Sequence, residues 1–241
     1  MEKYLYEDLY LLEEMHWWHI SKRRLVNELI SHYIDFPKPN ILDIGCGTGK
    51  NIEMLSKIGN VWGIDSSKEA IKFCKKRGLK NVRIGESSNT GFKSSFFDVI
   101  TLLDVLEHVE KQDQTLQEIR RILKSEGVLI ITVPAFNWLW TKWDEVLHHK
   151  RRYTEQALQE VLERSNYNII KISYMFSFLV LPALIIRSIK SIFYNSYYPS
   201  DFKSSSPLLN NIFLKVADFE RFFVKINKLP FGTSLICVAK K

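Results

Sequence analysis

One short stretch constrains the fold more than any other part of the sequence. Residues 40–49 read Asn-Ile-Leu-Asp-Ile-Gly-Cys-Gly-Thr-Gly, an apolar run that ends in glycines at alternate positions. The run predicts a buried parallel strand, and apolar residues at helical spacing beyond Gly49 predict a helix. Glycines permit positive φ and close approach of a ligand, while a helix start offers unpaired N–H groups. The stretch predicts a ligand-binding turn or, as the alternative, a plain strand-to-helix turn.

The spacing of the glycines separates this turn from two other nucleotide-binding loops. The dinucleotide motif G-x-G-x-x-G fits at Gly45 and Gly47 but fails at Lys50. The phosphate-binding motif G-x-x-x-x-G-K-[ST] is not satisfied either. An NAD-dependent oxidoreductase is disfavoured further, because the sequence offers no tyrosine–lysine pair suited to hydride transfer.

Polar residues follow the next two predicted strands. Strand 61–65 ends in Asp65, about 20 residues after the first glycine, where nucleotide-binding folds place an acid that binds ribose hydroxyls. A carboxylate suits that task because it accepts two hydroxyl donors at once. A capping or turn role is the alternative for Asp65. The short strand 82–84 is followed by Gly85-Glu86-Ser87.

Four segments in this order resemble the class I S-adenosylmethionine (SAM) methyltransferases. They are the Asp-x-Gly-x-Gly-x-Gly turn at 43–49, the strand that ends in Asp65, the strand and exit 97–109 with its Leu-Glu-His, and the Arg-Arg-x-Leu-Lys-x-x-Gly segment at 120–127. The resemblance covers residues 38–175 and the last strand. It implies that the glycine turn curls round the carboxypropyl group and the sulfonium of SAM.

The resemblance also implies how SAM binds. Asp65 would hold the ribose, and Glu86 would meet the adenine amino group, where the family more often has Asp followed by a small residue. Asp104 would border the methionine end, and His108 would either line the substrate side or cap the next helix. The implied SAM-binding set is Asp43, Gly45, Cys46, Gly47, Gly49, Asp65, Ser66, Glu86, Ser87, Leu103, Asp104 and His108.

The segment after the fifth predicted strand bears on the methyl acceptor, since ligands of open α/β sheets bind beyond the carboxyl ends of the strands. Residues 144–154 resemble a bacterial methyltransferase subgroup with an Asp…His-x-Arg-Arg-Tyr-Thr signature. A histidine there would take a proton from a substrate hydroxyl, and arginines would hold a carboxylate or phosphate. The matching positions are Asp144, His149, Arg151, Arg152 and Tyr153.

The predicted catalytic residues are His149, Arg152 and Tyr153. The alternative is an ordered loop in which Arg152 pairs with Asp144 and Thr154 caps a helix over 155–165. Two adjacent histidines do not make a metal site without further ligands, so no metal is predicted.

Residues 1–36 read as helices, with Trp17 and Trp18 just before the basic run Lys22-Arg23-Arg24. This arrangement resembles the N-terminal cap of ubiquinone-type O-methyltransferases, in which the cap helps to close the cofactor site. The alternative is that the tryptophans only anchor the helix on the core.

A long insert separates the last two predicted strands, 168–173 and 233–239. About 60 residues lie between them, far more than a hairpin connection needs. Helical patterns over 176–194 and 208–226 mix apolar residues with cations, which suits an anionic membrane surface. A lid over an apolar substrate, a homodimer face and plain packing stay open. The cations are Arg187, Lys190, Arg221, Lys225 and Lys228.

Composition limits the partners and the compartment. The net charge of +7 suits an anionic partner without selecting one, and the absence of an RNA-binding motif argues against nucleic acid. Three scattered cysteines make no disulfide framework, so a cytoplasmic protein with reduced thiols is expected. The N-terminus has no signal-peptide pattern, and the longest apolar run, 175–186, is shorter than the ~20 residues that span a membrane.

The sequence thus predicts an α/β, Rossmann-like, doubly wound sheet of seven strands with the last strand antiparallel. The expected parts are an N-terminal helical cap (1–36), a SAM-binding core (37–175), a helical insert (176–232) and the final core strand (233–241). The expected function is SAM-dependent O-methylation of a small-molecule or lipid-linked acceptor, at the inner face of the membrane if the insert binds lipid. The alternative is a non-catalytic SAM-binding scaffold or a membrane-associated interaction protein.

Overall fold

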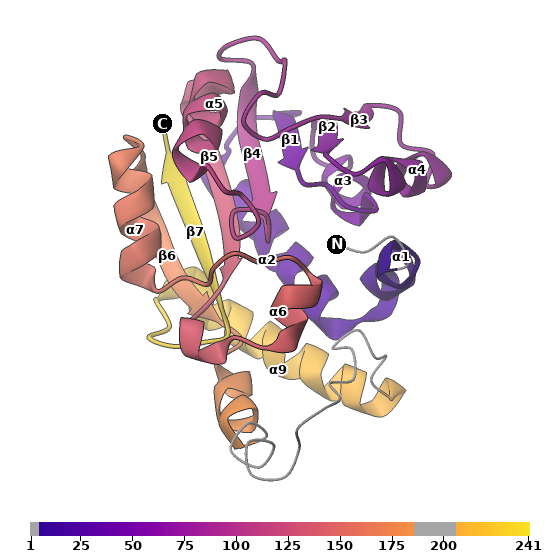
Figure 1. The fold of residues 1–241 in the computed structure, drawn as a ribbon, viewed down its shortest axis with the longest axis vertical. Coiled ribbons are helices and arrows are strands. Elements are labelled where there is room, and N and C mark those ends of the chain that lie inside the picture. Colours follow the sequence, from indigo (N-terminus) through magenta and orange to yellow (C-terminus); the bar gives the residue numbers. More distant parts are fainter. Residues whose placement is uncertain (1–4, 186–205) are drawn as a thin grey trace.

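The computed structural model describes residues 5–185 and 206–241, which are built around one mixed β-sheet (Figure 1). The sheet has seven strands in the order β3-β2-β1-β4-β5-β7-β6. β7 is antiparallel to both β5 and β6, and the other pairings are parallel. This confirms the predicted fold class. The strands are β1 (Asn40–Ile44), β2 (Asn60–Asp65), β3 (Val82–Ile84), β4 (Phe97–Leu103), β5 (Leu123–Pro134), β6 (Asn168–Met175) and β7 (Ser234–Lys240).

Helices cover both faces of the sheet. Leu116 and Leu158 belong to the core on one face, which α5 and α7 cover. Leu29, Ile52 and Ala217 belong to the core on the other face, where α2, α3 and α9 lie. Residues 180–185 are also helical. The named helices are α1 (Leu5–Met15), α2 (Trp17–Tyr33), α3 (Lys50–Leu55), α4 (Lys68–Lys76), α5 (Gln112–Ile122), η1 (Asn137–Leu139), α6 (Lys142–Val146), α7 (Glu155–Arg164), η2 (Ser177–Leu179) and α9 (Pro207–Ile226).

β5 shows why two helical layers are needed. Leu129 and Ile131 point into one core, and Val128 and Ile130 point into the other. Successive side chains of a strand face opposite sides of the sheet, so a continuous apolar run must be covered on both. All four side chains are fully buried.

The insert packs against the N-terminal helices. α9 runs alongside α2 (Figure 1), and Arg221 of α9 forms an ion pair with Glu28 of α2. The side chain of Asn210 accepts a hydrogen bond from the N–H of Trp17 at 2.9 Å and donates one to the carbonyl of Met15 at 2.9 Å. The predicted helix over 208–226 is confirmed as α9.

The other half of the insert prediction lies largely outside the described residues. This applies to Arg187, to Lys190 and to most of the polar stretch over 197–207 that separates the two helical patterns in the sequence. Within the ranges that the structure describes, no helix combines the length and hydropathy needed to cross a bilayer.

Two local predictions are wrong. The Lys-Ser-Glu-Gly sequence of residues 124–127 predicts a turn between a helix and the fifth strand. These residues instead belong to β5, because the strand begins directly after α5 and a register shift against β4 takes up the irregularity. His108 does not cap the next helix, since the N-cap of α5 is Lys111 and no side chain caps it by a hydrogen bond. The predicted cap of α7 is confirmed: Thr154 Oγ1 accepts the N–H of Ala157 at 3.2 Å.

Candidate functional site

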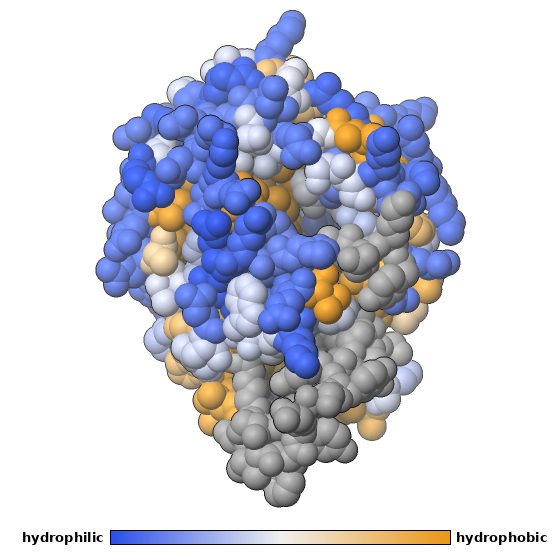
Figure 2. Space-filling model, viewed as in Figure 1, coloured by the Kyte–Doolittle hydropathy of each residue, from blue (hydrophilic) through white to orange (hydrophobic). Residues whose placement is uncertain are grey.

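A hollow of about 670 Å³ opens at the carboxyl ends of β1, β2 and β4. In the space-filling view the surrounding face is largely hydrophilic and is hollowed near its middle, where apolar residues are visible (Figure 2). Asp43 and Gly49 are the two members of the predicted SAM-binding set that do not line the hollow. The members that line it are Gly45, Cys46, Gly47, Asp65, Ser66, Glu86, Ser87, Leu103, Asp104 and His108.

The glycine turn has a conformation that other residues resist. Gly45 has a φ of +69°, and a Cβ placed on it would lie 2.3 Å from Cγ2 of Val105. Gly49 has a φ of +91° and is the N-cap residue of α3. Positive φ is open to glycine at little steric cost. At Gly45 a side chain would both strain the backbone and collide with Val105.

Asp65 ties β2 to the glycine turn. Its Oδ2 accepts the N–H of Gly47 at 2.9 Å, and its Oδ1 accepts the N–H of Ser67 at 2.9 Å. Burial raises the pKa of Asp65, and these two backbone hydrogen bonds oppose the effect. A carboxylate has about four acceptor positions, so Asp65 can accept two more donors from a ligand.

Asp43 lies beneath the turn and supports it. Its carboxyl is buried, and Oδ1 accepts a hydrogen bond from Oγ1 of Thr101 at 2.7 Å. Burial raises the pKa of Asp43 to about 7, although the Thr101 hydrogen bond opposes the effect. The side chain therefore holds the end of β1 against β4 instead of facing the hollow.

Helices α1 and α2 supply one wall of the hollow. Trp17 is buried against Phe176 and Phe213, with ring centroids 5.5 and 5.3 Å apart. Trp18 lines the hollow. Trp17 therefore anchors the helix on the core, and Trp18 has the position expected of a cap residue beside the cofactor site. The lining residues from these helices are Tyr6, Leu9, Glu13, Trp18, His19, Lys22 and Arg23.

Lys22 and Asp104 form an ion pair at the methionine end of the predicted cofactor site. The Lys22 ammonium also lies 3.3 Å from the ring centroid of Trp18. Burial lowers the pKa of Lys22, and Asp104 opposes the effect. Sequence reasoning missed Lys22, because only the packing of α2 over β4 brings it to the site.

The structure separates the three predicted catalytic residues. His149 lines both the large hollow and a second hollow of about 350 Å³. Arg152 lines only the second. Tyr153 lines neither, since its ring is buried and its hydroxyl contacts Gln112 and the carbonyl of Leu106. Burial raises the pKa of Tyr153, so its hydroxyl keeps its proton.

Asp144 organises this segment. Its Oδ1 lies 2.9 Å from Nδ1 of His149 and accepts Nε of Arg152 at 2.7 Å, while Oδ2 accepts the N–H of Thr141 at 2.7 Å. Burial acts to raise the pKa of Asp144, but the hydrogen bonds from His149 and Arg152 outweigh it and hold the pKa well below its usual range. The alternative prediction, an Arg152–Asp144 pair in an ordered loop, matches this geometry.

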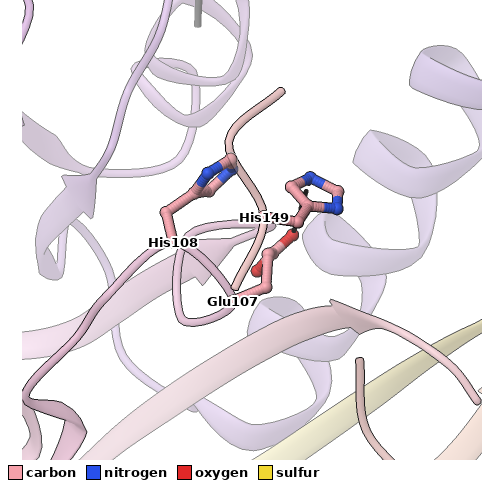
Figure 3. Close-up of side chains that lie close together, drawn as sticks. All are labelled: Glu107, His108 and His149. Carbon is pink, nitrogen blue, oxygen red and sulfur yellow. Dashed lines mark ion pairs between the residues drawn. The ribbon is translucent and has the colours of Figure 1, made fainter. Parts of the chain in front are cut away.

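Glu107 and His108 complete the site beside His149 (Figure 3). The Glu107 carboxylate is fully buried, and Oε1 lies 3.9 Å from Nε2 of His149. Burial raises the pKa of Glu107, and the nearby Asp104 adds to the rise. Burial lowers the pKa of His108 to about 4, with a further contribution from His149. The sequence offered one signal for Glu107, the Leu-Glu-His at the exit of β4.

Comparisons with known proteins agree with this geometry. Residues 42–131 match the model of the methyltransferase domain, a match that stops short of the His-x-Arg-Arg-Tyr-Thr segment. A solved SAM-dependent methyltransferase from Thermotoga maritima, described as a possible histamine N-methyltransferase, superposes with a TM-score of 0.62 at 17% identity, over 98% of this chain and 94% of that one. The chain has the class I methyltransferase fold. This was the fold implied by the sequence resemblance.

Other known proteins match over smaller shares of their own length. Phosphoethanolamine N-methyltransferase 2 of Haemonchus contortus, solved with SAM, gives a TM-score of 0.59 at 16% identity and covers 90% of this chain and 52% of that chain. The ubiquinone biosynthesis O-methyltransferase of Rickettsia canadensis is 33% identical over 114 residues, which are 45% of this chain and 48% of that protein. An uncharacterised protein of Methanocaldococcus jannaschii is 33% identical over 132 residues, 53% of this chain and 62% of that protein. The chain spans about half the length of these curated relatives. The domain match supports SAM as the cofactor.

Proposed function

We propose that the chain is a SAM-dependent methyltransferase that transfers a methyl group to an oxygen of a small-molecule or lipid-linked acceptor. The observation that carries the proposal is the 670 Å³ hollow, in which the glycine turn, Asp65 and Glu86 meet at the carboxyl edge of the sheet. Its volume is in the range of small-molecule sites. His149 lines the same hollow, so one space offers both a cofactor site and a group for the acceptor.

The proposed reaction is an in-line displacement at the methyl carbon of SAM. The sulfonium is a good leaving group, so alignment of the two reactants supplies most of the rate. A hydroxyl acceptor also needs to lose its proton, and His149 is the candidate group. Asp144 holds Nδ1 of His149 at 2.9 Å, which leaves Nε2 for the acceptor side. Arg152 is engaged by Asp144, so we assign it to positioning of this pair.

The second hollow supports an acceptor with an apolar part. It has a volume of about 350 Å³ and shares Trp18, His19, Asp104, Leu147 and His149 with the large hollow. Its remaining wall includes Leu12, Trp17, Pro134, Trp143 and Leu179. A quinone, a lipid or a lipid-linked glycan would place its apolar part there and its hydroxyl or carboxylate at His149.

The outer face of α9 supports a peripheral location at the inner face of the cytoplasmic membrane. Phe219 and Phe222 are 68% and 57% exposed. Arg221 and Lys225, however, both pair with Glu28 of α2, so the apolar residues would supply most of the attraction to lipid. A homodimer face is the competing use of this surface. The exposed apolar residues of α9 are Leu208, Leu209, Ile212, Val216, Phe219, Phe222, Phe223 and Ile226.

A non-catalytic SAM-binding scaffold is the alternative from another functional class. Both proposals expect SAM to bind, and only the enzyme transfers the methyl group. Protein supplied with tritiated-methyl SAM and fractionated lipid, glycan, protein and RNA pools should label the lipid or glycan fraction. SAM binding without label in any pool would favour the scaffold, and label in protein or RNA would overturn the proposed acceptor class.

A further inference from the structure

Three side chains at the wall between the two hollows have the composition of a metal site. One ligand atom each from Glu107, His108 and His149 lies within 4.8 Å of the other two. Figure 3 shows the Glu107 carboxylate pointing toward His149, with His108 beside them. The rings of His108 and His149 meet edge to face, with centroids 4.7 Å apart.

The environment of the Glu107 carboxylate is the observation that indicates a bound cation. The side chain has 0% exposure, and neither Oε1 nor Oε2 has a hydrogen-bond partner among the described residues. A buried carboxylate without hydrogen bonds is costly, and such groups in proteins are paired or coordinate metals. The basic side chain nearest to Glu107 in an ion-pair geometry is His149, whose Nε2 lies 3.9 Å from Oε1, a separation longer than a hydrogen bond.

The surroundings of the two histidines resemble the supports of metal ligands. Metal-binding histidines usually donate their second ring N–H to a carboxylate or a backbone carbonyl. His149 has Nδ1 2.9 Å from the buried carboxylate of Asp144. His108 has a hydrogen bond with the backbone of His148. Each ring therefore has one nitrogen occupied by a support, which leaves the other for a cation.

Lys22 is a nearby cation that could neutralise the Glu107 carboxylate in place of a metal ion. Its ammonium is paired with Asp104 and lies over the ring of Trp18. The ion pairs among the described residues include none between Lys22 and Glu107. Lys22 is bonded to Asp104 and, like Arg152, acts on Glu107 only through space, so both carboxylate oxygens of Glu107 lack a direct partner among the described residues.

We propose that Glu107, His108 and His149 bind one divalent cation, which holds the acceptor oxygen between the two hollows. Two imidazoles and one carboxylate suit Zn²⁺, Co²⁺, Fe²⁺ or Mn²⁺, and three protein ligands leave a position open for a substrate oxygen. Tetrahedral ligands with bonds of about 2.0–2.2 Å lie roughly 3.4 Å apart, so small side-chain rotations close the site.

The role of the cation rests on the proposed function. A hydroxyl bound to it gives its proton to solvent more readily than a free hydroxyl does. The oxygen electron pair then forms the bond to the methyl carbon, the electrons of the carbon–sulfur bond return to sulfur, and S-adenosylhomocysteine leaves. In this refinement of the proposed function, His149 acts on the acceptor as a ligand of the cation, which replaces the direct base role given to it above.

Titration of the chelator-treated full chain with Co²⁺ and with Zn²⁺ tests the site directly. We expect one Co²⁺ per chain, with a visible absorption spectrum of low coordination number. Loss of a supporting group commonly weakens a metal site 10–100-fold, so loss of a ligand in Glu107→Gln or His108→Ala should weaken binding by about 100-fold or more. His32→Ala, at an exposed position near the end of α2, is the control and should bind as the unmodified chain does.

Calorimetry with SAM and thermal unfolding distinguish loss of the metal site from loss of the cofactor site or of the fold. Calorimetry with SAM should give the same affinity for Glu107→Gln and for the unmodified chain, because Glu107 does not line the large hollow. A loss of SAM binding is thereby distinguished from a loss of the metal site. With chelator present, Glu107→Gln should unfold at a higher temperature than the unmodified chain and should lose the rise that Zn²⁺ causes. Absence of stoichiometric Co²⁺ and Zn²⁺ binding, or equal binding by Glu107→Gln, would overturn the inference.

Discussion

The carboxylate of Asp65 accepts the backbone N–H of Gly47 at 2.9 Å. This contact joins the end of β2 to the middle of the glycine turn, so the two halves of the predicted cofactor site form one unit. Two features that lie about 20 residues apart in the sequence are thereby held at one edge of the sheet. A substitution at Asp65 or Gly47 should therefore affect SAM affinity more than the stability of the hydrophobic core.

Asp65→Ala should reduce SAM affinity by at least about 100-fold, because two hydrogen bonds from ribose hydroxyls to a charged acceptor are worth about 1.5–3 kcal/mol each. Isothermal calorimetry measures the affinity, and thermal unfolding checks that the fold survives. Asp113→Ala, which removes an exposed acid of α5, is the control. Unchanged affinity in Asp65→Ala would count strongly against the proposed site.

Gly45→Ala should reduce SAM affinity or stability more than the same substitution does at a glycine with positive φ and open space around it. The new Cβ would lie 2.3 Å from Cγ2 of Val105, at a φ of +69°. Gly78→Ala is a matched control, since Gly78 has a φ of +79° but open space around it. The double variant Gly45→Ala with Val105→Ala should recover part of the loss. Equal effects at Gly45 and Gly78 would mean that only backbone strain matters.

His149→Ala should lower turnover by about 100-fold and change SAM affinity little, whether His149 takes the proton or binds a cation. Measured kcat and the SAM dissociation constant separate these effects. Asp144→Asn should give a smaller loss of kcat, because the ring stays while its support weakens. Full activity in His149→Ala would remove this residue from the chemistry.

Asp43→Asn should stabilise the protein increasingly as the pH rises from 5 to 8. The folded pKa of Asp43 is raised from an ordinary 3.8 to about 7, so its contribution to stability is complete below about 3.8 and is lost as the pH rises through about 7. Asparagine does not titrate. Urea unfolding of both proteins at several pH values measures the difference in unfolding free energy, and a constant difference would contradict the assignment.

Flotation with anionic vesicles tests the proposed use of α9. The unmodified chain should float with the vesicles, and Phe219→Ser with Phe222→Ser should reduce the bound fraction several-fold, because both side chains are more than half exposed. Leu11→Ser, which changes an exposed leucine of α1, is the control. No flotation of the unmodified chain at low salt would end the membrane proposal, and a shift of the variant from dimer to monomer would favour a homodimer face.

The sequence by itself determined the sheet, the order of its parts and the residues at the strand ends that line the large hollow. It could do so because strand ends of a doubly wound sheet meet at one edge, so that Gly45, Asp65, Glu86 and Asp104 converge by topology alone. The spacing of apolar residues and of glycines along the chain predicts which segments form strands, helices and turns. The same spacing of apolar residues predicted α9 within the insert, which the structure confirms.

Only the tertiary structure decided which polar groups near this edge lie in the site. Tyr153 follows Arg152 directly in the sequence, yet its ring enters the core, because the chain pairs with the end of β5 there through the Ala135–Tyr153 bridge. Lys22 reaches the site through the packing of α2, which no local pattern encodes, and the Leu-Glu-His pattern at the exit of β4 did not reveal that the carboxylate of Glu107 is fully buried. Burial and charge pairing are properties of contacts between distant segments, so their outcome appears only when the chain has folded.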